Sequence, residues 1–161
     1  MAGNQVQIFD STLRDGVQGQ GISFSLEDKL KIVKALDDIQ VDFIEAGNPG
    51  SNPKDMEFFK RLKDIELKHS KIAAFGSTRR PNIKVEEDKN IKDLLSSEAD
   101  VVVIFGKSWD FQVTDIIRTS LEENIQMIKD TIKYLCSKNK KVIFDAEHFY
   151  DGYKANRDYA I

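Results

Sequence analysis

The stretch "DVVVIFGKSWD", residues 100–110, decides the fold of this chain. Its continuous apolar run, residues 101–105, is typical of a short strand that is buried on both faces. Polar residues, among them Lys107, Ser108 and Asp110, follow directly behind the run. A short apolar run that ends in a polar cluster recurs at four further places along the chain.

Helical patterns lie between these runs. Strands are predicted over residues 5–10, 41–47, 71–77, 100–106 and 140–147, and helices over 25–40, 53–65, 86–99 and 120–139, with another helix opening at 156. Asn52 before Pro53, and Ser120 with Glu123, are typical of helix starts. The face expected to be buried in the longest helix consists of Leu121, Ile125, Ile128, Ile132 and Leu135. Strands that alternate with helices imply a parallel sheet covered by helices.

Two α/β architectures fit this order, and the strand ends decide between them. An open doubly wound sheet gathers its functional residues at one switch point, whereas a (β/α)8 TIM barrel carries them at the carboxyl ends of its strands. Polar residues follow every predicted strand, among them Asp15, Glu45, Thr78, Ser108 and Glu147. No glycine-rich phosphate loop follows any strand. The sequence therefore predicts an α/β fold of the TIM-barrel type.

The length indicates how much of a barrel is present. A full barrel takes about 250 residues, and five strands in 161 residues make a little over half of one. We expect residues 1–161 to form one partial barrel domain, the first five β/α units, with the C-terminal strands and any regulatory domain outside it. An unclosed sheet edge invites pairing, and we expect a homodimer.

Composition excludes several classes of protein. A hydrophobic fraction of 40%, a charged fraction of 32% and a formal net charge of -3 are typical of a soluble globular chain. We expect no nucleic-acid partner and no membrane span, because the chain has neither a dense basic patch nor a long apolar run. The start of the chain lacks a signal-peptide pattern, which favours a cytoplasmic protein. The single cysteine, Cys136, excludes a disulfide framework and is expected to be buried; Arg79 and Arg80 are expected in a solvated turn.

The stretch "LRDGVQ", residues 13–18, carries the clearest chemistry at a strand end. Asp15 could bind a hard divalent cation through oxygen, and Arg14 could stabilise negative charge on a substrate oxygen. Gln18 can donate or accept a hydrogen bond at the same rim. The alternative is an Arg–Asp pair beside an ordinary turn, because Asp-Gly is a common turn dipeptide. Chemistry alone leaves both interpretations open.

The stretch "FDAEHFYDGY", residues 144–153, is the second candidate. Glu147, just past the end of the fifth strand, could act as a general acid or base; the alternative is a solvated loop carboxylate. His148 has no second histidine nearby, which favours a structural or surface role. Trp109 and Phe111 either wall a ligand or pack within their loop.

These residues resemble a known family. "LRDGVQ", followed by ten residues and Lys29, fits the pattern L-R-[DE]-G-x-Q-x(10)-K at every fixed position. That pattern marks the homocitrate and 2-isopropylmalate synthases, which are grouped with HMG-CoA lyase and other metal-dependent barrel enzymes. The likeness continues through "IEAGNP", "AAFGSTRR", "VVVIFGKSWDFQV" and "FDAEHFYDGYKAN". The last two stretches are most similar to the citramalate synthase branch.

The resemblance implies a role for each matching residue. Asp15 corresponds to the metal-binding carboxylate, Arg14 to the catalytic arginine over the keto oxygen, and Glu147 to a catalytic glutamate near the substrate. The expected substrate-binding residues are Gln18, Glu45 and Ser108. The implied cofactor is a divalent metal, Mg²⁺, Mn²⁺ or Zn²⁺, which polarises the ketone of a 2-oxo acid.

The implied activity is that of an acyltransferase. Acetyl-CoA would lose a methyl proton, its enolate would attack the ketone of the 2-oxo acid, and hydrolysis of the thioester would release the product. Pyruvate, giving citramalate in the biosynthesis of isoleucine and leucine, is the expected partner substrate. The alternatives are a 2-isopropylmalate or homocitrate synthase, a carbon–carbon lyase of the HMG-CoA lyase type, and a non-catalytic half-barrel that assembles with itself or a partner.

The chain departs from the family pattern in two ways. The family completes its metal site with a His-x-His pair on a later strand, whereas this chain has only His69 and His148. Gln112 stands where a histidine is expected in much of the branch. We therefore expect Asp15 to be one ligand of a site whose other protein ligands lie beyond residue 161.

These departures predict that the 161-residue chain has no activity by itself, because it carries one expected metal ligand of three and has an open sheet edge. The measurement is release of free CoA thiol from acetyl-CoA in the presence of pyruvate and added Mg²⁺ or Mn²⁺. Clear turnover by this chain would contradict the prediction.

Overall fold

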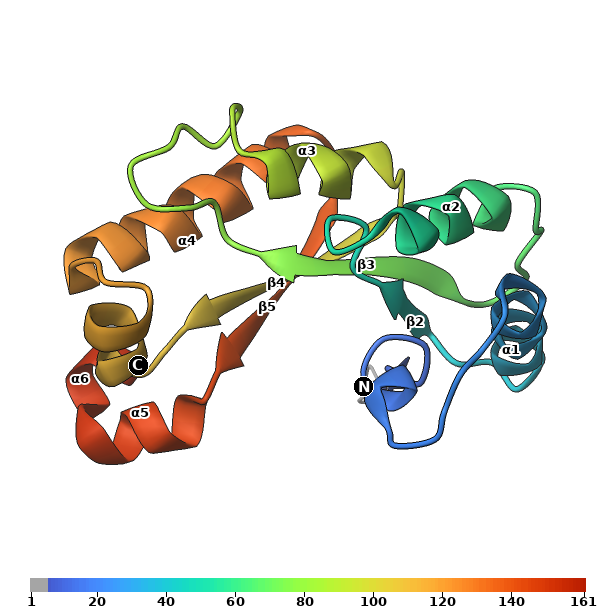
Figure 1. Cartoon of the computed structure of the whole chain (residues 1–161), viewed down its shortest axis with the longest axis horizontal. Helices are drawn as coiled ribbons and strands as arrows, with labels where there is room; N and C mark the ends of the chain where they lie inside the picture. The colour runs from blue at the N-terminus through green and yellow to red at the C-terminus, as the bar shows by residue number, and fades with distance from the viewer. Residues whose placement is uncertain (1–5) are drawn as a thin grey trace, which may run out of the picture.

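One parallel sheet of five strands forms the centre of the molecule, and its strand order is the order of the chain, β1-β2-β3-β4-β5. A computed structural model describes residues 6–161 (Figure 1). The strands are β1 (Phe9–Asp10), β2 (Phe43–Gly47), β3 (Lys71–Ser77), β4 (Val101–Lys107) and β5 (Lys141–Glu147). All five coincide with predicted strands, although β1 is reduced to two residues.

Helices follow the strands in regular alternation. They are α1 (Leu26–Asp38), α2 (Pro53–Leu62), α3 (Lys89–Ser96), α4 (Leu121–Ser137), α5 (Phe149–Ala155) and α6 (Arg157–Ala160). A single 3₁₀ turn, η1 (Gly16–Gln18), follows β1, and a short π-helix, η2 (Gln112–Ile116), follows β4. None of the helices within residues 6–161 combines the length and the apolar character that a membrane crossing requires.

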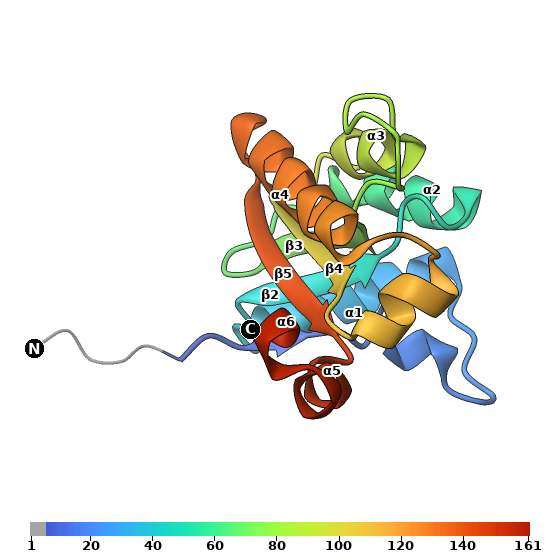
Figure 2. The same ribbon diagram turned by 90° about the vertical axis from the view of Figure 1, so that its left-hand side faces the viewer.

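The strand order determines where the helices lie. Crossover connections between parallel strands are right-handed, so steps that always move in one direction place every helix on the same face. A doubly wound sheet reverses its order and covers both faces. Figures 1 and 2 show α2, α3 and α4 together over the convex face of a curled sheet. The prediction of a partial TIM barrel is therefore confirmed.

The two faces of the sheet have different surroundings because side chains alternate along each strand. Residues of one parity, such as Ile44, Ala74 and Val102, pack against the helices in the main core. Residues of the other parity form a smaller cluster on the concave face: Phe43, Ala73, Val101 and Val103, with Phe75 and Ile143 at its margin. The polar residues at the carboxyl ends of β2, β4 and β5 continue this concave face.

Two predicted helix starts are confirmed. Asn52 caps α2 and accepts a hydrogen bond from the Asp55 amide, with Pro53 in the first turn. Ser120 caps α4 through the Glu123 amide. The Glu123 side chain, however, pairs with Arg79 instead of completing a capping box.

The predicted buried face of α4 is partly wrong. The buried residues are Asn124, Met127, Thr131 and Leu135. Two of them are polar and have partners in other elements: Thr131 accepts from the Arg79 amide at 2.9 Å, and Asn124 donates to the Lys107 carbonyl at 2.8 Å. These bonds rotate the helix so that Ile125 and Cys136 are exposed, contrary to expectation.

Arg79 and Arg80 do not form a solvated turn. The guanidinium of Arg79 is buried and pairs with Glu123 at 2.7 Å and Asp130 at 2.8 Å, which ties the loop after β3 to α4. Arg80 remains largely exposed beside Asp88, the N-cap of α3. Arg79 thus has a structural role, whereas Arg80 lies at the surface.

The buried carboxylate of Asp37 ties the end of α1 to the start of β3. It accepts hydrogen bonds from the amides of Lys68, His69 and Ser70 at 2.9, 2.9 and 2.7 Å. Burial by itself would raise the pKa of Asp37, but these amide bonds outweigh it and hold the pKa at about 2.

We predict that Asp37→Asn lowers the free energy of unfolding by about 2 kcal/mol at pH 7, because hydrogen bonds to a charged group are lost. The pKa of Asp37 is lowered in the folded chain, so its contribution is complete above the ordinary pKa and disappears as the pH falls from about 4 towards 2. Urea unfolding of both variants between pH 7 and 3 measures this. The exposed neighbour supplies the control, Asp38→Asn, which should change little; an equal loss in both variants would contradict the assignment.

Candidate active site

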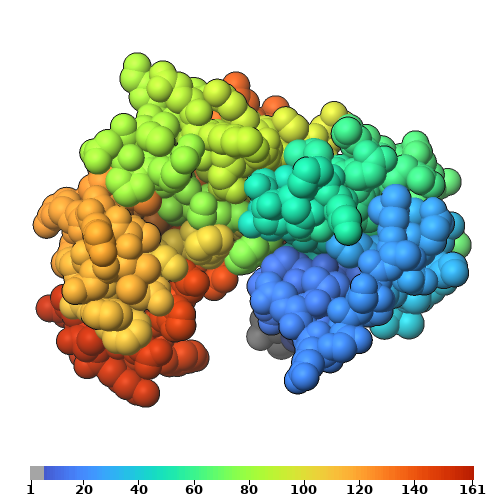
Figure 3. Space-filling model, viewed as in Figure 1, coloured from blue at the N-terminus to red at the C-terminus, as the bar shows by residue number. Residues whose placement is uncertain are grey.

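The carboxyl ends of the strands meet along one rim of the curled sheet. Figure 3 shows the molecule hollowed between its N-terminal and C-terminal portions, with β3 and β4 between them. Residues at the ends of β2, β4 and β5 that share the parity of Phe43 and Val103 face this hollow: Glu45, Lys107, Asp145 and Glu147. Side chains from distant parts of the chain therefore converge at one place.

Arg14 is the best-anchored side chain at this rim. Its Nε donates to Glu45 Oε2 at 2.7 Å, and its Nη1 lies 3.0 Å from Asp15 Oδ1. The guanidinium carbon stands 4.1 Å from the centre of the Phe75 ring, within the range of a cation–π contact. The fully buried side chain of Leu13 anchors the loop that carries it. The Arg–Asp pair, which the sequence left open as one of two interpretations of this stretch, is thus present, and Glu45 joins it.

Glu45 is a buried carboxylate, with 1% of its surface exposed. Burial raises its pKa, and the hydrogen bond and charge of Arg14 offset this only in part. The nearby charges of Asp145 and Asp15 raise the pKa of Glu45 further. Arg14 therefore stabilises the negative charge of Glu45, and Glu45 in turn holds the Arg14 guanidinium in place.

A second ion pair joins the neighbouring strands at the rim. Lys107 and Glu147 are register partners on β4 and β5, and Lys107 Nζ is hydrogen-bonded to Glu147 Oε2. Glu147 is the last residue of β5. The rings of Phe75 and Phe105 stack 5.1 Å apart between the two ion pairs. These two rings form the aromatic floor of the hollow.

The remaining predicted residues lie around this centre. Ser108 is buried, and its amide donates to the Glu147 carbonyl at 3.4 Å. Gln18 is exposed in η1 and lines a cavity next to Arg14. Asp15 is largely exposed, and its carboxylate pairs with the Arg14 guanidinium. The structure thus brings Arg14, Asp15 and Glu45 into one contact group and places Glu147 in another.

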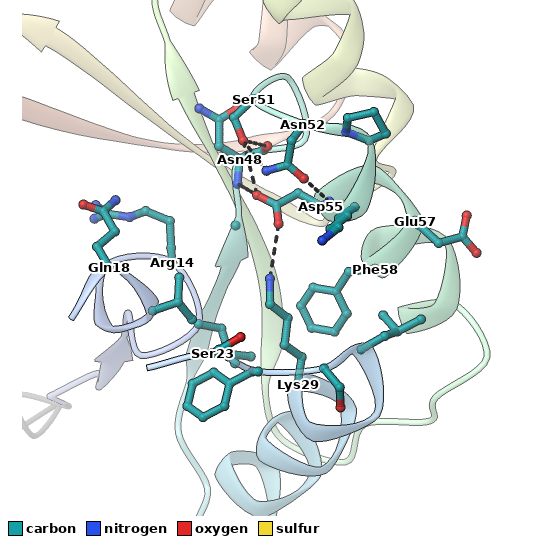
Figure 4. A pocket seen from close by; sticks show the side chains of 18 of the residues that line it. Arg14, Gln18, Ser23, Lys29, Asn48, Ser51, Asn52, Asp55, Glu57 and Phe58 are labelled. Carbon is teal, nitrogen blue, oxygen red and sulfur yellow. Dashed lines mark hydrogen bonds and ion pairs between the residues drawn. The ribbon is translucent and has the colours of Figure 1, made fainter. Parts of the chain in front are cut away.

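A cavity of about 1000 Å³ opens between the loop after β1 and the start of α2 (Figure 4). Lys29 crosses it from α1 and pairs with Asp55 of α2 at 3.2 Å. The other oxygen of Asp55 accepts from the Asn48 amide at 3.3 Å and from the Ser51 hydroxyl at 3.4 Å. Lys29, the last residue of the sequence pattern, therefore holds the loop after β2 rather than approaching Arg14.

Sequence reasoning missed Lys107 and Asp55 as members of these networks. Lys107 is the last residue of β4 and its side chain faces the concave side of the sheet. Glu147 has the same position on β5, so the signal that identified Glu147 could also have identified Lys107. Asp55 lies in the first turn of α2, where an acidic residue is common at any helix start, so no local signal separates it from an ordinary capping residue.

The donor set for a metal is incomplete in the described part of the chain. Residues 6–161 bring together no group of three or more histidine, cysteine or acidic side chains suited to a metal ion. Asp15 offers an exposed carboxylate, a ligand type that hard divalent cations prefer. The residues present fit one ligand position of such an ion.

Comparisons with known sequences agree with this geometry. Residues 5–156 match the family model HMGL-like. The chain is 55% identical over 157 residues to the (R)-citramalate synthase of Aquifex aeolicus, covering 98% of this chain and 30% of the relative. It is 54% identical over 156 residues to that of Geobacter sulfurreducens, covering 97% and 30%. A homocitrate synthase of Saccharolobus solfataricus is 34% identical over 160 residues, covering 98% and 32%. The chain thus spans about a third of the length of these curated relatives.

Solved structures share the fold. The hydroxymethylglutaryl-CoA lyase of Pseudomonas aeruginosa matches with a TM-score of 0.64 at 20% identity, over 87% of this chain and 45% of that one. The HMG-CoA lyase of Brucella melitensis matches with a TM-score of 0.62 at 18% identity, over 86% and 47%. At these identities the likeness concerns the fold.

The dependence of Glu45 on Arg14 gives a prediction. Arg14→Gln leaves a buried carboxylate without its ion pair and should lower the free energy of unfolding at pH 7 by about 2 to 4 kcal/mol. Since burial raises the pKa of Glu45, protonation relieves this cost, so the deficit should shrink as the pH falls from 7 to 5. Urea unfolding at both pH values measures it.

The matched control is Asp15→Asn, which removes the exposed partner of the same guanidinium and should cost less than about 1 kcal/mol. A deficit of Arg14→Gln that is the same at both pH values would contradict the role assigned to Glu45.

Proposed function

We propose that this chain, which belongs to the HMGL-like family, forms the N-terminal part of a barrel enzyme that condenses acetyl-CoA with a 2-oxo acid. The observation that carries the proposal is the concave rim, where Arg14 and Glu147 stand at the two ends of the aromatic floor, each held by an ion pair. The names of the most similar relatives, (R)-citramalate synthases, point to pyruvate as the 2-oxo acid.

Arg14 is suited to stabilise the oxygen of the reacting ketone. Its guanidinium is fixed by Glu45, Asp15 and the Phe75 ring before any substrate arrives. A donor that is already oriented need not reorganise when negative charge develops on the keto oxygen, which is the main source of electrostatic catalysis. Arg14 in this proposal holds that charge until the oxygen is protonated.

Glu147 is suited to take the proton from the methyl group of acetyl-CoA. Its carboxylate lies at the end of β5 on the concave face, within the same hollow as Arg14. The methyl carbon would then form a bond with the keto carbon, and the keto oxygen would become a hydroxyl group. Water hydrolyses the thioester in the last step and releases free CoA.

The same proposal assigns the remaining groups. Asp15 would hold a divalent metal, Mg²⁺, Mn²⁺ or Zn²⁺, whose chemistry is to polarise the ketone. The residues that would line the substrate are Gln18, Glu45 and Ser108. We propose a single partial barrel domain in residues 1–161, a homodimer, a cytoplasmic location and a place in the biosynthesis of branched-chain amino acids. A lyase of the same family, which would split a hydroxyacyl-CoA, is the second candidate to be tested.

A fusion tests the proposal. This chain replaces the matching N-terminal part of the Aquifex aeolicus relative, and release of CoA thiol is followed with acetyl-CoA, Mn²⁺ and pyruvate. We expect turnover that falls at least about 100-fold in Arg14→Lys, because a bidentate guanidinium site does not accept an ammonium. The control is Arg61→Lys, an exposed arginine on α2 outside the rim.

A folded fusion that releases no thiol with pyruvate or a longer 2-oxo acid would contradict the proposal. Cleavage of 3-hydroxy-3-methylglutaryl-CoA by the same fusion would support the lyase instead. Circular dichroism establishes that each variant is folded before it is assayed.

A further inference from the structure

Lys107 and Glu147 form an ion pair that the fold holds in place from both sides. They are direct register partners on adjacent parallel strands, so the backbone fixes the spacing of their α-carbons. Both side chains are largely withdrawn from water, with 18% and 32% of their side-chain surfaces exposed. Forming the pair therefore orders only the two side chains, because the backbone that carries them is already fixed by the sheet.

The backbone of Lys107 is anchored by a buried amide. Asn124 of α4, 1% exposed, donates from Nδ2 to the Lys107 carbonyl at 2.8 Å and to the Tyr159 hydroxyl at 2.6 Å. Both printed bonds of this amide come from Nδ2, while its Oδ1 is buried without a partner among the described residues. This helix contact therefore fixes the end of β4, where the lysine projects into the hollow.

The ammonium of Lys107 lies over the aromatic floor. Its Nζ is 5.5 Å from the centre of the Phe105 ring, and Phe105 stacks on Phe75, the ring beneath Arg14. The floor thus carries one cation at each end, and each cation binds one glutamate. Arg14 holds Glu45, and Lys107 holds Glu147.

Other carboxylates around the hollow would repel Glu147 if Lys107 were absent. Carboxylates of Glu45, Asp145 and Asp15 share the rim closely enough that the last two raise the pKa of the first. Glu147 is a further carboxylate at the end of the same strand as Asp145. Without a cation beside it, repulsion would favour rotamers that turn Glu147 away from the hollow.

We propose that Lys107 is a positioning residue: it holds the Glu147 carboxylate in the rotamer that faces the substrate methyl group. The inference rests on the proposed function, in which Glu147 takes the methyl proton. Lys107 acts through Glu147 and does not touch the substrate. A displacement of about 1 Å in a reacting group can cost 100-fold in rate, so loosening this carboxylate lowers turnover while leaving substrate affinity nearly unchanged.

The first test needs no activity. In the 161-residue chain labelled with ¹³C and ¹⁵N, three-bond couplings to Glu147 Cγ report its χ1 rotamer. We expect one dominant rotamer in the native chain, averaging in Lys107→Met, and recovery in Lys107→Arg, which restores the cation. An unchanged rotamer distribution in Lys107→Met would overturn the proposal.

The chain offers a matched control in Lys141→Met. Lys141 lies at the opposite end of β5 on the same concave face, with its Nζ 4.3 Å from the centre of the Phe43 ring. It is thus also a strand lysine over an aromatic ring, but it is six positions away from Glu147 along the strand. This variant should leave the Glu147 couplings as they are in the native chain.

The second test uses the fusion with the Aquifex aeolicus relative. Lys107→Met should lower kcat about 10- to 100-fold with KM for pyruvate and acetyl-CoA within about 3-fold, and Lys107→Arg should regain most of the loss. Equal losses in Lys107→Met and Lys141→Met, a change confined to KM, or no recovery with arginine would overturn the inference. An inactive native fusion would contradict the proposed function instead, while the rotamer measurement still decides the role of Lys107.

Discussion

The right-handed crossover, repeated four times in one direction, is the constraint on which the rest of this structure depends. It places the helices that connect the strands on the convex face of the sheet, and strand residues alone form the small apolar cluster of the concave face. Because all five strands are parallel, their carboxyl ends lie along one rim. Every polar side chain that ends a strand with inward parity is therefore directed into the same hollow, however far apart these residues are in the sequence.

The chemistry of the rim follows from pairing charges in a partly buried place. A buried carboxylate is costly unless a cation sustains it, and Glu45 and Glu147 each have one, from a loop and from a neighbouring strand. The two cations lie at the ends of the stacked rings of Phe75 and Phe105. Burial raises the pKa of Glu45 even beside Arg14, so the fold opposes the charge that this ion pair sustains.

The sequence predicts the strands, the helix starts and the barrel because these depend on local periodicity and capping. It does not predict which face of α4 is buried, because hydrogen bonds to other elements bury Asn124 and Thr131 and leave Cys136 exposed. Helix α5 is also missed. A Cβ on Gly152 would clash with the Ser108 carbonyl oxygen, so this glycine, which looks like a turn signal, permits the close approach of α5 to the end of β4. At the site, Arg14 and Glu147 were singled out from the sequence, whereas Lys107, the partner of Glu147, depended on the register of β4 and β5.

We propose that Arg14, Asp15 and Glu147 serve one reacting centre on the concave rim. A crystal structure of the fusion with pyruvate and Mn²⁺ tests this, with the position of the Mn²⁺ ion taken from its anomalous scattering. We expect the metal bound to the Asp15 carboxylate, a pyruvate oxygen within hydrogen-bonding distance of Arg14, and the Glu147 carboxylate facing the same hollow. Metal and pyruvate bound outside this hollow, with no contact to Arg14, would contradict it.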